Sequence, residues 1–533
     1  MGGASIDLDG YNEIGALEQN FQTKIGQSYR ISFYMAGNPD PSPPLKTMEV
    51  KSGTFDDIFS YDTSTHGASR ESMNYVAETF IFSATSGSTA LQFISTDTNN
   101  IGRGPVIGDV SVSLIPADSE FQIHAFTGAT INSDGAAPTS QLTPNSSGVL
   151  FGTTQAGGAN SFAGTNGTAL SCGTMFSLIP NFDGTAWTEQ TLFSFGSQAW
   201  FPTGRLTYDR TGDILYGTAL YGGGSGCGGA GCGAVYQLTA PTSGVSSTQT
   251  ILFTFLGAAD GGLPNAHLLQ DPSTGIIYGT TRQGGTSGCG GIGCGVVFML
   301  TPPVSGSVWT ETGLYKFTGG KDGSTPLDIN MDASGNIYGA TAGGGAFGKG
   351  VVFKLTAAAK GPWTETVLRS FRGDRDGAYP ASGVVVDKSG NLYGTTSQGG
   401  GDRNCTGGCG TVFKLAPPAS GAVWAETILY RFRGLNDGQN PEADLIADST
   451  VSNLYGTTAG GGSQNCAGGC GTAFKLTAPA SGAGWKETIL HRFLGGDDGS
   501  VPMAGLHMDS AGKLYGTTVS GGPGNLGTAF QLQ

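Results

Sequence analysis

The chain has 533 residues, of which 93 are Gly and only 12% are charged. Hydrophobic residues make up 38% and aromatic residues 10%, which excludes a disordered chain, and the glycines have no three-residue period, which excludes collagen. The net charge of −14, without a basic run, argues against nucleic acid as a partner, and no apolar run approaches the roughly 18 residues of a membrane-spanning helix.

The N-terminal part, residues 1–118, has the strand pattern of a small β-sandwich or jelly roll. Residues 28–34 alternate between apolar and polar side chains, as do 73–82, 90–94 and 110–114. The first residues carry none of the features of a signal peptide, whereas the Cys-rich loops further on are typical of exported proteins. We therefore expect a secreted or cell-surface protein whose leader is missing from this chain.

Residues 119–533 repeat. A Tyr-Gly-Thr-Thr segment, or a near variant, recurs seven times at spacings of 55–65 residues. Around it each repeat places an Asp-x-Ser-Gly-Asn type turn, a Gly-rich loop, two further strand segments and an Asp-Gly-x-x-Pro turn. Four strands per repeat, seven times, predict an all-β chain with a seven-bladed β-propeller after the sandwich. Residues 121–126 have the character of the outer strand that the last repeat lacks, so we expect them to pair with 527–532 and close the ring.

The repeated segments are similar to a known family. Gly-Asn-Leu-Tyr-Gly-Thr-Thr, Gly-Thr-Val-Phe-Lys-Leu and Trp-x-Glu-Thr-x-Leu-Tyr-x-Phe resemble the bacterial choice-of-anchor tandem repeat known as GloVer, over residues 121–533. Through segments 5–10, 36–40 and 108–112, residues 4–115 resemble the choice-of-anchor C domain, related to galactose-binding-like jelly rolls. That domain usually has further strands before segment 5–10, so its N-terminal strands are expected to be missing here. The resemblance implies an exported bacterial surface protein and supplies no catalytic residues.

Side chains that recur in every repeat are expected to be structural. The Asp of each Asp-Gly turn has two interpretations: a ring of carboxylates for Ca²⁺ or another ligand, or a good turn former. One Asp per turn lacks the dense spacing of a calcium loop, so the turn-forming role is favoured. We expect no other cofactor and no metal, unless His267 and His507, both on inner strands, meet Asp328 or Asp444. The Glu of each Trp-x-Glu pair is expected to pack between blades. The turn residues are Asp134, Asp260, Asp322, Asp376, Asp437 and Asp498.

The Cys residues occur mostly as close pairs in the loop between the second and third strands of a repeat. We expect four local disulfides, with a zinc site built from two neighbouring pairs as the alternative. Cys172 has no partner in its loop and is left as a free thiol or an intermolecular bridge. The pairs are Cys227 with Cys232, Cys289 with Cys294, Cys405 with Cys409, and Cys466 with Cys470.

The candidate site is where the repeats differ. One position of the inner strand, just before an aliphatic core residue, is polar or Gly and varies from repeat to repeat. In a propeller these side chains converge in the channel, which is what a polar ligand site needs; the alternative is a water-filled channel. The residues are Gln141, Arg205, His267, Asp328, Gly383, Asp444 and Gly505. Trp200, expected to be exposed, and Tyr379 are nearby aromatic candidates for stacking on a sugar ring.

Three functions remain open. The first is a secreted protein that binds polysaccharide or a cell-surface glycan, as a monomer, through the channel mouth on the face of the Asp-Gly turns. The second is a propeller enzyme, a polysaccharide lyase or glycoside hydrolase; no Ser-elbow, His-Glu-x-x-His or phosphate-loop motif supports it. The third is a structural surface platform. The fold alone does not decide among them.

Overall fold

The computed structural model divides into two compact units, Met1–Ser119 with Pro180–Ala186, and Glu120–Ile179 with Trp187–Gln533. The residues that it describes are 5–10, 13–25, 28–38, 44–53, 55–64, 68, 73–96, 104–115, 120–128, 134–163, 169–181, 186–209, 213–239, 247–358, 361–402, 404–420, 423–479 and 484–532. No helix within these ranges has the length and apolarity needed to cross a bilayer.

The first unit is a β-sandwich. One antiparallel sheet has the order β1 (Ser5–Asp7), β10 (Pro105–Ile115), β5 (Ser28–Gly37) and β8 (Val76–Ser83); the other has the order β4 (Ala16–Gln22), β9 (Ser88–Ser95), β6 (Leu45–Ser52) and β7 (Phe55–Asp62). Strands β2 (Asp9–Gly10) and β3 (Glu13–Ile14) form a small hairpin. The alternating strand patterns place Ile31, Phe33, Phe80 and Phe93 in one shared core.

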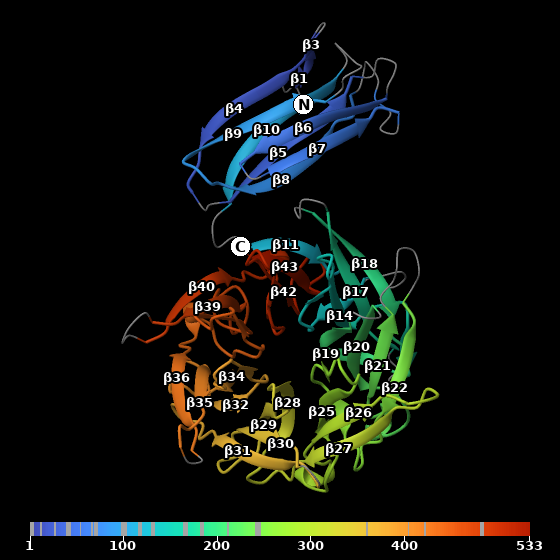
Figure 1. The fold of residues 1–533 in the computed structure, drawn as a ribbon, viewed down its shortest axis with the longest axis vertical. Coiled ribbons are helices and arrows are strands. Elements are labelled where there is room, and N and C mark those ends of the chain that lie inside the picture. Colours follow the sequence, from blue (N-terminus) through green and yellow to red (C-terminus); the bar gives the residue numbers. More distant parts are fainter. Residues whose placement is uncertain are drawn as a thin grey trace. The chain divides into compact units, whose positions relative to one another are not determined.

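The second unit is a propeller of seven antiparallel sheets, arranged as a ring in Figure 1. Blade 1 consists of β12 (Ala136–Pro138), β13 (Thr143–Pro144), β14 (Leu150–Ala156), β17 (Thr174–Pro180) and β18 (Trp187–Ser194). Blade 2 consists of β19 (Trp200–Asp209), β20 (Ile214–Tyr221), β21 (Ala234–Thr239) and β22 (Gln249–Thr254). Blade 3 consists of β23 (Gly262–Pro264), β24 (Leu269–Gln270), β25 (Ile277–Gln283), β26 (Val296–Thr301) and β27 (Thr310–Lys316). A hairpin of β15 (Ser161–Ala163) and β16 (Ala169–Ser171) extends from blade 1.

Blades 4 to 7 repeat the same order from the channel outwards. They are β28 (Ser324–Met331), β29 (Ile337–Gly343), β30 (Val351–Thr356) and β31 (Thr364–Ser370); β32 (Ala378–Pro380), β33 (Val385–Val386), β34 (Leu392–Gln398), β35 (Thr411–Ala416) and β36 (Ala425–Arg431); β37 (Ile446–Ala447), β38 (Asn453–Thr458), β39 (Thr472–Thr477) and β40 (Lys486–Arg492); and β41 (His507–Met508), β42 (Leu514–Thr518), β43 (Thr528–Leu532) and β11 (Glu120–Ala125). Four short 3₁₀ turns, η1 (Cys227–Gly229), η2 (Cys289–Gly291), η3 (Leu435–Asp437) and η4 (Gly496–Asp498), lie in the loops.

The repeated sequence is explained by packing inside each blade. In blade 5, a Cβ on Gly394 would lie 2.7 Å from Cζ of Phe413, so only Gly leaves room for that buried ring. The hydroxyls of Thr396 and Thr411 are 2.8 Å apart and satisfy each other inside the sheet. Tyr-Gly-Thr-Thr and the following Phe strand are therefore one packing unit, which recurs in the other blades.

The blades are joined by a repeated backbone contact. The residue before the first Pro of each inner strand has a positive φ, and its N–H donates to a carbonyl of the preceding blade, as Asn440 does to Cys409 at 3.0 Å. Gly410, which follows Cys409, packs against the ring of Pro441. A Cβ on Gly410 would lie 2.6 Å from Cδ of that proline. Close approach of two backbones at this point requires Gly.

Strand β11 completes the last blade. It pairs antiparallel with β43, from Glu120 opposite Leu532 to Ala125 opposite Thr528. The first and last strands of the second unit are thus hydrogen-bonded in one sheet (Figure 1), and this joint leaves no free strand edge between them.

Candidate functional site

The variable position of the inner strands lies where those strands are irregular. In blades 1, 3 and 5 the inner strand is interrupted there, between β12 and β13, β23 and β24, and β32 and β33. In blades 2 and 4 the register shifts at the same place, between Thr203 and Thr207 and between Pro326 and Ile329. Because such breaks release a side chain from the strand alternation, this position faces the channel although the next residue, such as Leu268, is buried in the core.

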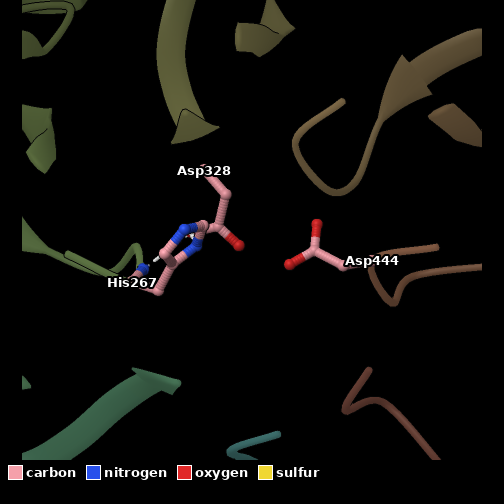
Figure 2. A group of neighbouring side chains, drawn as sticks. All are labelled: His267, Asp328 and Asp444. Atoms are coloured by element: carbon pink, nitrogen blue, oxygen red, sulfur yellow. Dashed lines mark hydrogen bonds and ion pairs between the residues drawn. The ribbon is translucent and has the colours of Figure 1, made fainter. Parts of the chain in front are cut away.

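Three of the variable side chains form one cluster (Figure 2). His267, Asp328 and Asp444, from blades 3, 4 and 6, each offer one ligand-type atom, and these atoms lie within 4.8 Å of one another. Asp328 Oδ1 accepts the backbone N–H of His267 at 2.7 Å, and Asp444 Oδ1 accepts that of Gly383 at 3.0 Å. Both carboxyl groups are therefore held by neighbouring blades.

Gln141 and Arg205 extend the cluster around the channel. Gln141 donates through Nε2 to the carbonyl of Leu506 at 2.7 Å, and Arg205 Nη1 is 3.4 Å from Gln141 Oε1. The two Gly positions have a steric role, because a Cβ on Gly383 would lie 2.8 Å from Cβ of Asp328, and one on Gly505 would lie 3.0 Å from Oε1 of Gln141. The two blades with Gly at this position thus leave room for the side chains of Asp328 and Gln141 from neighbouring blades.

The two carboxyl groups have opposite proton affinities. Burial and the charge of Asp328 raise the pKa of Asp444 well above its ordinary value. Burial would also raise the pKa of Asp328, but His267 and a hydrogen bond from Asp444 outweigh it and lower that pKa. The two pKa values are therefore shifted in opposite directions, because two carboxyl groups this close disfavour each other's ionisation.

The cluster borders two cavities of the channel. One, of about 430 Å³, is lined by residues at the beginnings of inner strands and includes Asp328 and Tyr379. The other, of about 460 Å³, includes His267 and residues of the turns that follow the inner strands. Gln141, Arg205 and Asp444 line both. The variable residues thus lie between the two cavities.

The aromatic candidates differ in their placement. Trp200 is not exposed, and this expectation is wrong: its side chain is 9% exposed because it stacks on Tyr221, its partner across the β19–β20 pair, with ring centroids 4.5 Å apart. Tyr379 lines the cavity of about 430 Å³ and accepts a hydrogen bond from Lys349 Nζ at 2.7 Å. Of the two, only Tyr379 borders the channel cavities.

The polar residues of the channel that sequence reasoning missed include Gln155, Arg282 and Glu442. Gln155, Arg282 and Glu442 line the cavity of about 430 Å³, and burial raises the pKa of Glu442 and lowers that of Arg282. Arg282 and Gln155 occupy the fourth place after the Tyr (or Phe) of the second-strand segment, where other repeats have Ala, Ser, Leu or Val. The same search for broken symmetry, applied to second strands and to the residue after the inner-strand Pro, finds all three.

The repeated Asp residues hold their own turns. Each Asp of an Asp-Gly turn accepts a backbone N–H of that turn, as Asp437 does from Arg433 at 2.7 Å and Asp498 from Leu494 at 2.6 Å. In the opposite turns, Asp387 accepts the N–H of Ser389 and of Asn391, each at 2.8 Å. These contacts agree with the turn-forming role.

The Cys pairs form four disulfides, as expected: Cys227–Cys232, Cys289–Cys294, Cys405–Cys409 and Cys466–Cys470. Cys172 is a buried free thiol. The alternative zinc site from neighbouring pairs is therefore excluded by the pairing within each loop. Disulfides in four loops are typical of proteins that fold in an oxidising compartment.

Comparison with known proteins agrees with the repeat structure. A family described as the Gloeobacter/Verrucomicrobia repeat matches residues 165–408, 227–467 and 292–530, which together span more than half of the chain. The chain belongs to this repeat family. The resemblance stated from the repeat text is confirmed, and residues 1–113 of this Gloeobacter/Verrucomicrobia repeat protein match a family of unknown function, DUF642.

Solved structures similar to the repeat protein include three with sugar-related titles. A Hadza microbial sialidase is 10% identical with a TM-score of 0.37, over 99% of this chain and 97% of its own. An ancestral GH74 enzyme is 12% identical with a TM-score of 0.44, over 85% of this chain and 54% of its own. The sugar-binding C-terminal domain of EclA is 12% identical with a TM-score of 0.18, over 21% of this chain and 79% of its own. No curated protein matches the sequence.

Proposed function

We propose that the propeller is a secreted binding module that holds a neutral, hydroxyl-rich ligand of the saccharide class in its channel. The observation that supports this most is the convergence of Arg205, His267, Asp328 and Asp444 from four different blades next to open cavities. A channel that only closes the fold has no need for Arg, His and Asp side chains that converge from four of its blades. Polar groups converging in a concave site are the usual mark of a ligand site.

The charges favour a neutral ligand over an ionic one. An anion near Arg205 would also face the Asp328 carboxylate, and a cation near Asp328 would also face the Arg205 guanidinium. Arg205 donates hydrogen bonds, and Asp328 and the Gln141 carbonyl accept them. Vicinal hydroxyls of a sugar both donate and accept, so they can use the two kinds of partner together. Tyr379 adds an aromatic ring to the same cavity.

A second function, hydrolysis or lysis of a polysaccharide, requires a wider separation of the pair of carboxyl groups. Asp328 and Asp444 face each other across the cluster (Figure 2) with one oxygen of each within 4.8 Å of the other, whereas glycoside hydrolases hold two carboxyl groups roughly 5–10 Å apart on either side of the bond that they cleave. Measuring product release beside binding separates this function from the first.

The test is a panel of neutral and acidic oligosaccharides, with binding measured by calorimetry and cleavage by new reducing ends and by unsaturated products. The variants are Arg205→Ala and Asp444→Asn, and the control is Lys321→Ala, an exposed residue beside the Asp322 turn that lines neither cavity. We expect a neutral oligosaccharide to bind to the wild type and to the control, with at least a tenfold loss in both channel variants and no product.

Other outcomes have definite meanings. Product that disappears in Asp444→Asn favours the enzyme. Binding that persists in both channel variants moves the ligand elsewhere, for example to the β-sandwich, and contradicts the channel site. The absence of binding and product across the panel favours the structural platform.

A further inference from the structure

The cluster of His267, Asp328 and Asp444 also has the composition of a metal site. The group brings one imidazole and two carboxyl groups from three blades to within 4.8 Å of one another. Figure 2 shows Asp328 and Asp444 extending toward each other, with the ring of His267 beside Asp328. Among the described residues, no other group of His, Cys, Asp and Glu meets the same distance limit.

A second observation concerns the imidazole itself. The His267 side chain is 5% exposed, and its Nε2 has no hydrogen-bond partner within the described structure. Nδ1 has only the ion-pair contact to Asp328 Oδ1, at 3.3 Å. Leaving a buried polar atom without a hydrogen-bond partner is unfavourable, so an imidazole of this kind next to two carboxyl groups points to a ligand.

The other His residues near Asp side chains are different. Nε2 of His124 is 2.8 Å from Asp134, and Nε2 of His491 is 3.1 Å from both oxygens of Asp498. Each of these imidazoles lies on the outer strand of its blade and has its Asp partner in the turn that follows that strand. They provide matched controls, because the same two residue types occur there without a third ligand.

We propose that His267, Asp328 and Asp444 bind one divalent transition-metal ion, with Zn²⁺ as the ion that fits best. Three protein ligands with nitrogen and oxygen donors, and an open fourth position on a cavity, are the arrangement of exposed zinc sites. Ca²⁺ and Mg²⁺ prefer oxygen ligands throughout, so the imidazole disfavours them. The ion supplies His267 with the partner that it lacks.

The surroundings hold the two carboxyl groups in place for this role. One oxygen of Asp328 is fixed by the N–H of His267 and one of Asp444 by the N–H of Gly383, which is how outer partners orient metal ligands. The Arg205 guanidinium near Asp444 opposes the ion, so we expect moderate affinity, with a dissociation constant of about 10 µM or below.

The metal proposal does not rest on saccharide binding, although both use the same channel. Saccharide binding that persists after chelation, together with no metal binding, contradicts this proposal alone. Metal binding without any saccharide ligand contradicts only the function proposed above.

The test is a titration of the chelator-treated full chain with ZnCl₂ by calorimetry, together with the shift of the melting temperature at saturating Zn²⁺. We expect one site per chain and a rise in melting temperature in the wild type. His267→Ala and Asp444→Asn should each weaken binding at least tenfold. His491→Ala and Cys172→Ser should bind as the wild type does.

Two results would overturn the proposal. One is the absence of heat and of a melting shift at about 1 mM Zn²⁺, a hundred times the expected dissociation constant. The other is binding that survives both ligand substitutions, or that is lost in Cys172→Ser instead. Asp444→Asn is nearly isosteric, so it tests the ligand role even where His267→Ala lowers stability.

Discussion

Buried charged side chains follow one pattern at the interfaces between blades and the opposite pattern in the channel. At the interfaces the same carboxyl group recurs, because Glu311, Glu365, Glu426 and Glu487 each lie beside the turn Asp of the preceding blade. In the channel, the residue at the corresponding position varies among Gln, Arg, His, Asp and Gly. Residues that recur from blade to blade serve the packing of the blades. Residues that differ between blades serve a site that the assembled ring forms only once.

The partner of the interface Glu shows how such a repeat tolerates variation. In blade 4 it is Arg369, which contacts Asp376 at 2.6 Å and Glu426 at 2.7 Å. In blade 5 it is Tyr430, which donates to Asp437 at 2.6 Å or to Glu487 at 2.8 Å. The partner changes but its position stays, so the interface is structural at every blade.

The largest expected effect is the dependence of stability on pH. Burial raises the pKa of Glu311, Glu365 and Glu426 to about 7 and that of Glu487 to about 8, from an ordinary value of about 4.5. Their contribution to stability is complete below about pH 4.5 and is lost as the pH rises to about 8, because the unfolded chain ionises first. At about 1 kcal/mol or more for each group, urea unfolding should show a clear loss of stability between pH 5 and pH 8.

The variant that checks this origin is Glu487→Gln, which cannot ionise. Its stability should fall less steeply than that of the wild type over the same pH range. If the stability of Glu487→Gln and of the wild type falls equally with pH, the interface Glu is not the cause of the pH dependence. If Glu365→Gln also shows a shallower fall of stability with pH, the same explanation holds at a second interface.

The next effect concerns the backbone contact between blades. Gly410→Ala places a methyl 2.5 Å from the carbonyl oxygen of Thr396 and 2.6 Å from Cδ of Pro441, at a φ of +99°. We expect a loss of about 3 kcal/mol, from overpacking and backbone strain together. Gly348→Ala is the control, because it has a φ of +68° but no atom within 4 Å of the new methyl, and should cost about 1 kcal/mol. Equal losses in the two variants would assign the effect to φ alone.

A smaller effect is expected from Arg369→Met. The variant keeps the length of the side chain but leaves Asp376 and Glu426 without their cation, at side-chain exposures of 12% and 11%. Removal of one partner from such a pair should cost about 2 kcal/mol in unfolding free energy, less than for a fully buried pair. The double variant with Glu426→Gln should recover part of that loss, and additive losses would show that the two residues do not interact.

The smallest effect on stability is expected in the channel. Arg205 borders both cavities and makes one long contact, 3.4 Å, to Gln141. Arg205→Ala should therefore change the unfolding free energy by less than about 1 kcal/mol while it lowers ligand affinity. A large loss of stability in Arg205→Ala would show that Arg205 stabilises the fold as Arg369 does, and would contradict the difference between these two residues.

The fold could be predicted to a large extent because its signals are local and repeated. The strand segments, the turns and the missing fourth strand of the last repeat can all be recognised in the sequence. The number of blades therefore follows from the number of repeats, and the disulfides follow from the spacing of the Cys pairs. The channel residues Arg205, His267, Asp328 and Asp444 also follow, since the breaks in symmetry are visible in aligned repeats.

The misses have physical causes. The burial of Trp200 depends on the ring of Tyr221 in the adjacent strand, a pairing that the loss of the Asp-Gly turn in that repeat does not reveal. The approach of Asp328 to Asp444, two blades apart, depends on Gly383 in the blade between them.

The β11–β43 pairing has a consequence for the history of the gene. The closing pair uses only the two ends of the array, so the duplication or deletion of one whole internal repeat leaves it unchanged. The number of blades can therefore change in a single genetic event without a new free edge. The channel has no such freedom, because a gained or lost blade changes the angles between the blades that carry Arg205, His267, Asp328 and Asp444.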